Sequence, residues 1–195
     1  MASLFTHALV GSALGQGAER EWRHDWRFWA LVVTCSVLPD IDSIGFHAGV
    51  PYGALWGHRG MTHSLLFAAI LATGLALAFQ RKFSPAWKLG VFLFVITASH
   101  GVLDAMTNGG LGVAFFAPFD TGRYFFGWRP IHVSPIGISR FFSWRGLRIL
   151  GNEALWIWCP ALLFAVLMRV AQRLRQPGKP LLTAEAESGP GDGLS

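Results

Sequence analysis

The amino-acid sequence predicts an all-α integral membrane protein, a bundle of four to five helices with a metal site at one end. Apolar residues make up 52% of the 195 residues and charged residues only 14%, well below the ~25% of ordinary soluble proteins. Nine Trp and sixteen Phe are typical of membrane proteins, whose aromatic side chains gather at the interfaces. His and Asp residues also stand inside or beside the apolar runs, where ionisable groups are costly without a partner.

Two apolar helices are expected in the first 38 residues. Residues 3–17 form a short apolar stretch rich in small residues, which either spans the membrane or lies in its interface. A charged segment at residues 18–27 precedes the second run, which extends from residue 28 to about residue 38. Pro39 is expected to weaken or end that helix, because proline removes a backbone donor.

Two more helices are expected after a Gly-rich loop. Thr62 can cap the first of them through its hydroxyl, so that this almost wholly apolar helix runs over residues 63–79. The next runs from about residue 87 to residue 106 and ends at the Asn-Gly-Gly sequence of residues 108–110.

The last third of the chain is more mixed. Residues 111–153 combine Gly, Pro, aromatic residues and Arg, and we expect a lid or re-entrant region there. A final apolar helix is expected from about residue 154 to residue 170. Residues 1–175 therefore form one membrane-embedded domain, and residues 176–195, rich in Pro, Gly and small polar residues, are expected to be a disordered tail.

The positive charges indicate an orientation. Ten of the sixteen Lys and Arg residues fall on one side of the predicted topology, and the richer side is expected to be cytoplasmic. The candidate metal ligands then fall at or near the outward face, and they still share one face if the protein is inverted. Because the basic residues flank apolar runs and form no stripe with interleaved aromatic residues, membrane lipids are the expected partners and nucleic acid is not.

The strongest pair of candidate ligands is His100 and Asp104. Being four residues apart on a predicted helix, they share a face and lie one turn apart. An imidazole and a carboxylate placed in this way can hold one ion or bridge two, and Zn²⁺ accepts nitrogen and oxygen ligands together. The alternative is a structural contact between the two side chains.

His58, His63, Asp40 and Asp42 form the second set of candidates. His58 and His63 flank a turn and a helix start, and the helix dipole favours the neutral, ligating form of His63. Asp40 directly after Pro39 is the first-choice carboxylate, with Asp42 close behind. The alternatives are a solvated loop residue for His58 and caps of the following turn for both carboxylates.

Other residues carry weaker signals. His7 and Glu153 qualify as ligands because they fall on the same side, although Glu153 can also be a simple helix-start residue. Arg59 binds either a substrate phosphate or a lipid headgroup, and Arg123 and Arg129 are candidates for clamping the same phosphate. No GxSxG, P-loop or HExxH motif and no Cys nucleophile context is present, which favours a metal-activated water as nucleophile.

Five motifs in order resemble a known family. They are Thr6-His7, Leu38-Pro-Asp-Ile-Asp42, Gly57-His-Arg-Gly-Met-Thr-His-Ser64, Ser99-His100-xxx-Asp104 and Gly151-Asn-Glu153. Together they resemble the LexA-regulated, membrane-bound predicted metal-dependent hydrolases of bacterial inner membranes, over most of residues 1–170. That family is in turn distantly similar to zinc-dependent phospholipase C and the S1/P1 nucleases. The resemblance implies zinc ions held by His, Asp and Glu, with Asp40 or Asp42, His58 or His63 and Glu153 joining His100 and Asp104.

The predicted function is that of a membrane-bound metal-dependent hydrolase, a phosphoesterase acting on a lipid or membrane-surface substrate. The expected cofactor is a divalent metal, Zn²⁺ first, held by His7, Asp40, His58, His63, His100, Asp104 and Glu153. Catalytic roles are expected for Asp40, Asp42, His63 and Asp104. The main alternative is a non-catalytic membrane protein with a structural or regulatory metal. A transporter is disfavoured, because the polar residues sit at helix ends and no inverted repeat is visible.

Overall fold

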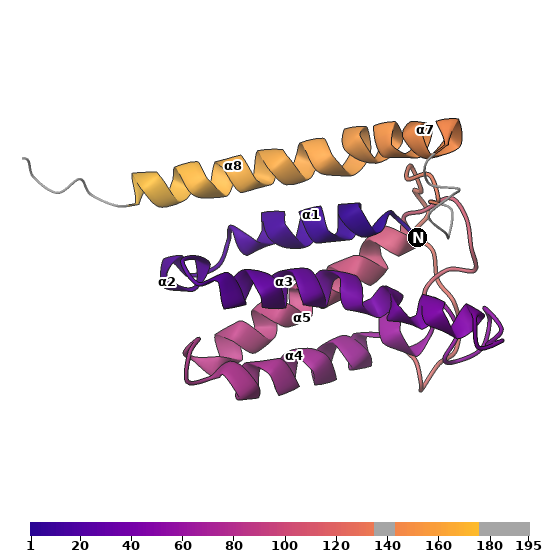
Figure 1. Ribbon diagram of the computed structural model, residues 1–195, viewed down its shortest axis with the longest axis horizontal. Helices are drawn as coiled ribbons and strands as arrows, with labels where there is room; N and C mark the ends of the chain where they lie inside the picture. The colour runs from indigo at the N-terminus through magenta and orange to yellow at the C-terminus, as the bar shows by residue number, and fades with distance from the viewer. Residues whose placement is uncertain (135–142, 176–195) are drawn as a thin grey trace, which may run out of the picture.

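The computed structural model describes residues 1–134 and 143–175, and this part of the chain is helical (Figure 1). The helices are α1 (Leu4–Gly15), α2 (Arg20–Arg23), α3 (Trp26–Val37), α4 (Leu65–Phe79), α5 (Ala86–Ala105), α7 (Trp144–Glu153) and α8 (Cys159–Leu174). Two 3₁₀ segments, η1 (Leu38–Phe46) and η2 (Met61–His63), and a π segment, η3 (Ala154–Trp158), complete the described elements. The described residues form no strand beyond two isolated bridges. The all-α prediction is confirmed, whereas the predicted tail at 176–195 lies outside the described residues.

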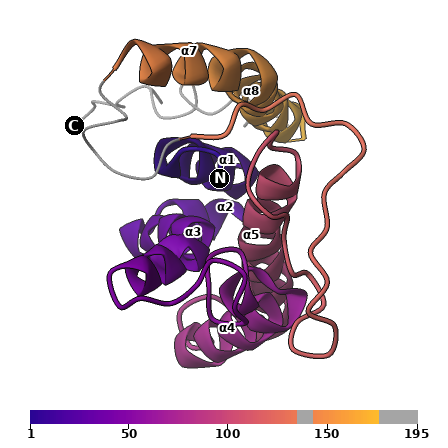
Figure 2. The same ribbon diagram turned by 90° about the vertical axis from the view of Figure 1, so that its right-hand side faces the viewer.

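The long helices run along a common direction, with the N-terminus near one end (Figure 1). Helix α1 packs against α3 on one side and α8 on the other, and α5 packs against both α3 and α4. Seen end-on, α7 and α8 form an outer layer over α1 (Figure 2). Because α8 contributes no buried residue, it leaves most of its apolar surface free for lipid.

Three helical runs are long and apolar enough to cross a membrane: Trp26–Phe46, Ala86–Ala105 and Trp144–Leu174. Helices α1 and α4 are apolar but shorter. The protein is therefore a membrane protein, as its composition predicts.

The apolar core lies between α3, α4 and α5, in the half of the bundle away from the N-terminus. Phe28, Val32, Leu89, Leu93 and Ile96 are fully buried there. Because lipid tails are as apolar as these side chains, close van der Waals packing holds the helices together here. The other half of the bundle holds a smaller apolar cluster around Ala2, Ile131 and Ile157, and it also holds the buried polar side chains.

Two details of the sequence-based helix assignment are wrong. Ser64, not Thr62, caps α4 and accepts a hydrogen bond from the Phe67 amide at 3.1 Å. The Thr62 hydroxyl instead donates to Asp42, because the short 3₁₀ turn η2 delays the start of α4 by two residues.

The last helix starts ten residues earlier than expected, at Trp144. Ser143 caps it by accepting a hydrogen bond from the Gly146 amide. Residues 144–153 interleave four apolar residues with two Arg, an Asn, a Glu and two Gly, and Ile149 is buried on one face. Hydropathy alone therefore places the start at residue 154. Glu153 consequently lies inside a continuous helical run, where α7 passes into η3, and not at a helix start.

The described part of the predicted lid, residues 111–134, wraps around the N-terminal end of the bundle (Figure 2). Val113 and Tyr124 exchange two backbone hydrogen bonds of 2.9 Å, and Ile131 bridges to Thr107. This path closes the end of the bundle where α5 finishes.

Close contact between α1 and α3 depends on small residues. A Cβ added at Gly11 would lie 2.6 Å from the Cβ of Ser36, and one added at Gly15 would lie 2.6 Å from the Trp29 ring. Glycines spaced by four residues allow such helix–helix approach in membranes.

Replacing Gly11 by Ala is therefore expected to destabilise the protein by about 1–3 kcal/mol, the usual effect of overpacking. Gly74 in α4 is the matched control, because a Cβ there meets no atom within 4 Å. Equilibrium unfolding in mixed micelles measures both variants. Equal stability of the two variants would contradict close packing of α1 on α3.

Candidate metal centre

Four segments bring polar side chains together at the end of the bundle where the N-terminus lies. Helix α1 supplies His7, η1 supplies Asp40 and Asp42, and α5 supplies His100 and Asp104. The loop before α4 adds three further buried residues, His58, Arg59 and His63. Residues that span about a hundred positions of sequence therefore share one buried region.

The first group consists of Asp40, His63, His100 and Asp104, whose ligand atoms all lie within 4.8 Å of one another. His63 Nε2 lies 3.1 Å from His100 Nε2 and 3.7 Å from both Asp40 Oδ1 and Asp104 Oδ2. His100 Nε2 lies 3.4 Å from Asp40 Oδ1. Bonds of ~2.0–2.2 Å to a tetrahedral ion place the donor atoms about 3.3–3.6 Å apart. The observed separations therefore bracket those of a tetrahedral site, and this group can hold a metal ion.

Asp40 is the clearest sign that the group is built for a cation. Both of its carboxylate oxygens are buried and have no hydrogen-bond partner among the described residues. The Nε2 atoms of His63 and His100 lie 3.7 and 3.4 Å from Oδ1, beyond good hydrogen-bond geometry. Burying a carboxylate without hydrogen bonds is costly, and a cation bound among these groups would offset that cost.

His100 is oriented by a hydrogen bond on its far side. Its Nδ1 lies 2.8 Å from the carbonyl oxygen of Ser36, which fixes Nδ1 as the protonated nitrogen and leaves the lone pair of Nε2 facing the group. Such outer hydrogen bonds are the usual way to set the tautomer of a metal-binding histidine. His7 stacks on the His100 ring with centroids 3.6 Å apart, and its Nε2 lies 3.5 Å from Asp104 Oδ1.

Asp104 is held from two sides. The Ala2 amide donates to Oδ1 at 2.8 Å, and the Arg59 Nε donates to Oδ2 at 2.9 Å. These hydrogen bonds fix the carboxylate while each oxygen keeps room for a further contact. The segment before α1 therefore helps to build the site.

The second group consists of Asp42, His58 and His63. Asp42 Oδ1 lies 2.7 Å from His58 Nδ1, and Oδ2 lies 3.0 Å from His63 Nδ1. Oδ2 also accepts from the Thr62 hydroxyl at 2.6 Å and from the Arg59 amide at 3.1 Å. Unlike Asp40, Asp42 thus has four partners.

His63 belongs to both groups, with Nε2 facing the first and Nδ1 facing Asp42. Burial lowers its basicity, but the carboxylates of Asp40 and Asp42 outweigh this effect and raise the pKa of His63 to about 9. The carboxylates thus create a site that strongly favours a bound positive charge.

The three arginines predicted to bind substrate occupy different settings. Arg59 is fully buried, at a φ of 61°, and donates to Asp104, Gly109 and Thr107. Arg123 is half-buried and donates to the backbone carbonyls of His58, Tyr52 and Ala54. Arg129 is exposed and lies over the Phe125 ring at 4.7 Å.

Glu153 lies outside both groups. Its carboxylate accepts from the Ser3 amide at 2.6 Å, from the Ser3 hydroxyl at 2.5 Å and from the Thr6 hydroxyl at 2.7 Å. The Trp158 indole also donates to the Thr6 hydroxyl. Glu153 therefore ties the end of α7 to the start of α1, immediately beside the segment that holds Asp104. A π segment at this point is typical of functional regions.

Sequence reasoning missed the residues that support the group from outside. Ala2, Ser3 and Ser36 act through backbone atoms or long-range contacts, for which a sequence has no pattern. Of these residues, only Ser3 has a sequence signal, because a Ser directly before the first apolar helix is a typical N-cap.

These features define a class, the helical membrane proteins that carry a buried His and Asp group able to hold a metal ion. The chain belongs to the family described as YdjM inner membrane protein, whose model matches residues 1–176. It is similar to the inner membrane protein YbcI of Escherichia coli strain K12, with 34% identity over 164 residues, 84% of this chain and 94% of that protein. No solved structure matches the chain.

The two groups lead to a prediction about Asp42. If it only orients His58 and His63, Asp42→Asn is expected to weaken metal affinity by about 10–100-fold and leave the number of ions at saturation unchanged. Asp40→Asn, the matched change two residues away, removes a ligand and is expected to weaken binding more. Metal titration of the purified protein in detergent measures both. Loss of one of two ions in Asp42→Asn would instead make the second group a metal site of its own.

Proposed function

We propose that this protein is a membrane-bound metal-dependent hydrolase, a phosphoesterase acting on a lipid or on a substrate at the membrane surface. The observation that carries the proposal is the chemistry of the first group. It contains two Asp and two His, and the buried Asp40 carboxylate makes no hydrogen bond with the described residues. Structural zinc sites are mostly rich in Cys, whereas catalytic sites use His and carboxylates. The chain has two cysteines, Cys35 and Cys159, and neither belongs to the group.

The roles of the residues follow from their contacts. Asp40, His63, His100 and Asp104 would hold the ion, with His7 placed against Asp104 as a further donor. Zn²⁺, the first candidate, would polarise a phosphoester and lower the pKa of a bound water towards ~7. Asp42 would keep Nδ1 of His63 protonated so that Nε2 faces the ion.

The location of the group supports a substrate at the membrane surface. The group lies at one end of the bundle, where α3 passes into η1, α5 ends and the loop before α4 begins. The basic residues Arg123 and Arg129 belong to the segment that covers this end. If the Lys- and Arg-rich end is cytoplasmic, the metal group faces outward.

A structural metal is the second candidate function, and one observation favours it. His63, His100 and Asp104 are at most 5% exposed and Asp40 is 6% exposed. Structural sites are closed in this way, whereas catalytic sites keep one coordination position open. Under this alternative the ion would only tie α5 to η1 and η2.

Hydrolysis assays separate the two candidates. Zinc-loaded protein in detergent would be tested against a chromogenic phosphodiester, a phosphomonoester and short-chain phospholipids. The hydrolase proposal expects turnover that a chelator abolishes and added zinc restores, and that Asp40→Asn lowers at least about 100-fold. His47→Ala, an exposed histidine at the end of η1, should keep full activity. A fully loaded protein that is inactive across the panel and unfolds when chelated would support the structural metal.

A further inference from the structure

The other end of the bundle carries a cleft lined by arginines. It has a volume of about 690 Å³, and its lining residues come from the end of α1, from α2 and α3 and from α8. Arg20 and Arg23 line it from α2, Arg169 and Arg173 line it from α8, and Gln16 and Gln172 lie between them. The lining contains no Asp or Glu. Four cations therefore face one space without a carboxylate among them.

Hydrogen bonds hold this arginine cleft in shape. Gln16 accepts from Arg169 Nε at 3.1 Å, and its backbone oxygen accepts from the Gln172 amide group at 2.7 Å. The Trp29 indole, also in the lining, donates to the backbone oxygen of Arg23. Contacts across about 150 residues of sequence thus place the arginines of α2 and α8 opposite each other.

Three of the cleft's arginines have no carboxylate partner among the described residues. Arg23, Arg169 and Arg173 form no ion pair with Asp or Glu within residues 1–134 and 143–175. The Nε of Arg23 is buried and has no hydrogen-bond partner in the same part of the chain. Burial and the neighbouring charges of Arg169 and Arg20 lower the pKa of Arg23, with only Glu21 opposing them.

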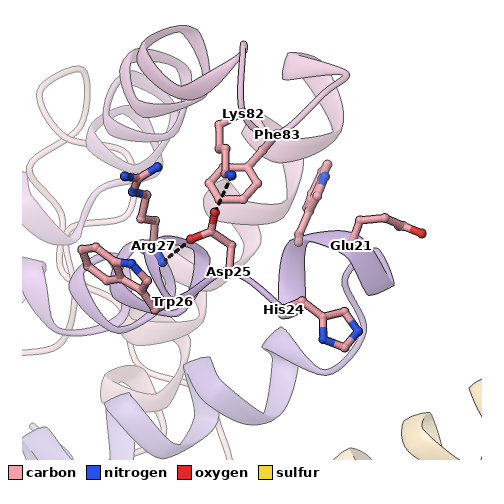
Figure 3. A pocket seen from close by; sticks show the side chains of 8 residues that line it. Glu21, His24, Asp25, Trp26, Arg27, Lys82 and Phe83 are labelled. Atoms are coloured by element: carbon pink, nitrogen blue, oxygen red, sulfur yellow. Dashed lines mark hydrogen bonds and ion pairs between the residues drawn. The ribbon is translucent and has the colours of Figure 1, made fainter.

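The lysines at the same end behave differently. Lys82 pairs with Asp25 at 2.9 Å in the neighbouring pocket (Figure 3). Lys88 pairs with Glu19 at 2.7 Å. Lysine–carboxylate pairs are therefore present at this end of the bundle, whereas Arg23, Arg169 and Arg173 form no such pair within the described residues.

A second cleft, of about 480 Å³, adjoins the first and shares Arg20, Arg23 and Gln172 with it. Its other lining residues include the apolar Phe92, Met168 and Ala171, together with Arg175 and the paired Glu19 and Lys88. Basic and apolar surfaces thus adjoin each other, which complements the anionic phosphate and the apolar acyl chains of a phospholipid.

We propose that the arginine cleft binds the phosphate headgroup of an anionic membrane phospholipid, with an acyl chain lying along Phe92 and Met168. Guanidinium groups bind phosphate through two parallel hydrogen bonds, and basic pockets between transmembrane helices are suited to anionic headgroups. The site is separate from the metal group, which lies at the opposite end of the same helices. Helix α8 packs mainly against α1 and η3. A phospholipid bound in the cleft would also link α8 to α2.

Native mass spectrometry of the full chain in detergent tests this proposal with phosphatidylglycerol and phosphatidylcholine of matched acyl chains. Wild type is expected to prefer phosphatidylglycerol, and the double change Arg169→Gln with Arg173→Gln to weaken that binding roughly 30-fold. The control, Arg27→Gln with Arg81→Gln, removes the same charge at the same end outside both clefts, and should change affinity less than about twofold.

Three outcomes would overturn the proposal: equal affinity for the two lipids, an equal loss in the control, or displacement of phosphatidylglycerol by inorganic phosphate beyond the effect of chloride at the same ionic strength. The last would mean a site for free phosphate. If the α8 double variant does not fold, Arg23→Gln replaces it, because the Trp29 bond is to the backbone of Arg23 and survives. The affinity of the wild type for phosphatidylglycerol should also fall as the salt concentration rises, because salt screens the attraction between arginine and phosphate.

Discussion

His100→Ala is expected to abolish metal binding by the first group, the proposed metal site. His100 Nε2 faces both His63 and Asp40, so its loss removes one of the four proposed ligands. We expect affinity to fall by more than the ~100-fold that marks the upper end for changes in supporting residues. Elemental analysis of protein dialysed against buffered zinc measures the effect.

His47→Ala is the control for this experiment, because His47 is exposed and outside both groups. The stacking of His7 on His100 is lost as well, so folding of the variant should be verified by circular dichroism. Unchanged zinc affinity in a folded His100→Ala protein would show that the ion, if present, is held elsewhere.

Arg59→Met is expected to cause the largest loss of stability among single changes near the site. The guanidinium is fully buried and satisfies Asp104, Thr107 and the Gly109 carbonyl. Methionine fills similar space but leaves the Asp104 carboxylate without its cation. Breaking a buried ion pair in this way costs about 3–5 kcal/mol, measured by unfolding in mixed micelles.

Arg145→Met provides the comparison, because Arg145 is exposed on α7 and surface changes usually stay within about 0.5 kcal/mol. The loss of stability in Arg59→Lys should lie between those of the two Met variants. One ammonium group cannot make all the hydrogen bonds that the planar guanidinium donates to its three partners. If Arg59→Met unfolds like wild type yet loses turnover, Arg59 contacts substrate and its structural role is minor.

The pairing of His100 with Asp104 could be predicted because both lie on one regular helix, α5. The convergence of His7, His58 and His63 followed only from topology, and the structure brings all three to the same end. Helical periodicity and the distribution of charges were therefore enough to predict that these residues lie at one end of the bundle.

The sequence could not predict that Asp40 and Asp42 contact different histidines. After Pro39 the chain continues as a 3₁₀ helix, and that local geometry decides which carboxylate faces His100 and which faces His58. Glu153 is a similar case, since its contacts with Ser3 and Thr6 join positions about 150 residues apart. Such contacts depend on tertiary packing, which leaves no periodic mark on the sequence.

X-ray absorption at the zinc edge of the loaded wild-type protein tests the central claim most directly. The account predicts a shell of nitrogen and oxygen donors at about 2.0–2.2 Å, with imidazole scattering and no sulfur. That imidazole contribution should disappear in part in His63→Ala. A sulfur shell near about 2.3 Å, or a spectrum of zinc bound by water alone, would contradict a metal centre built by Asp40, His63, His100 and Asp104.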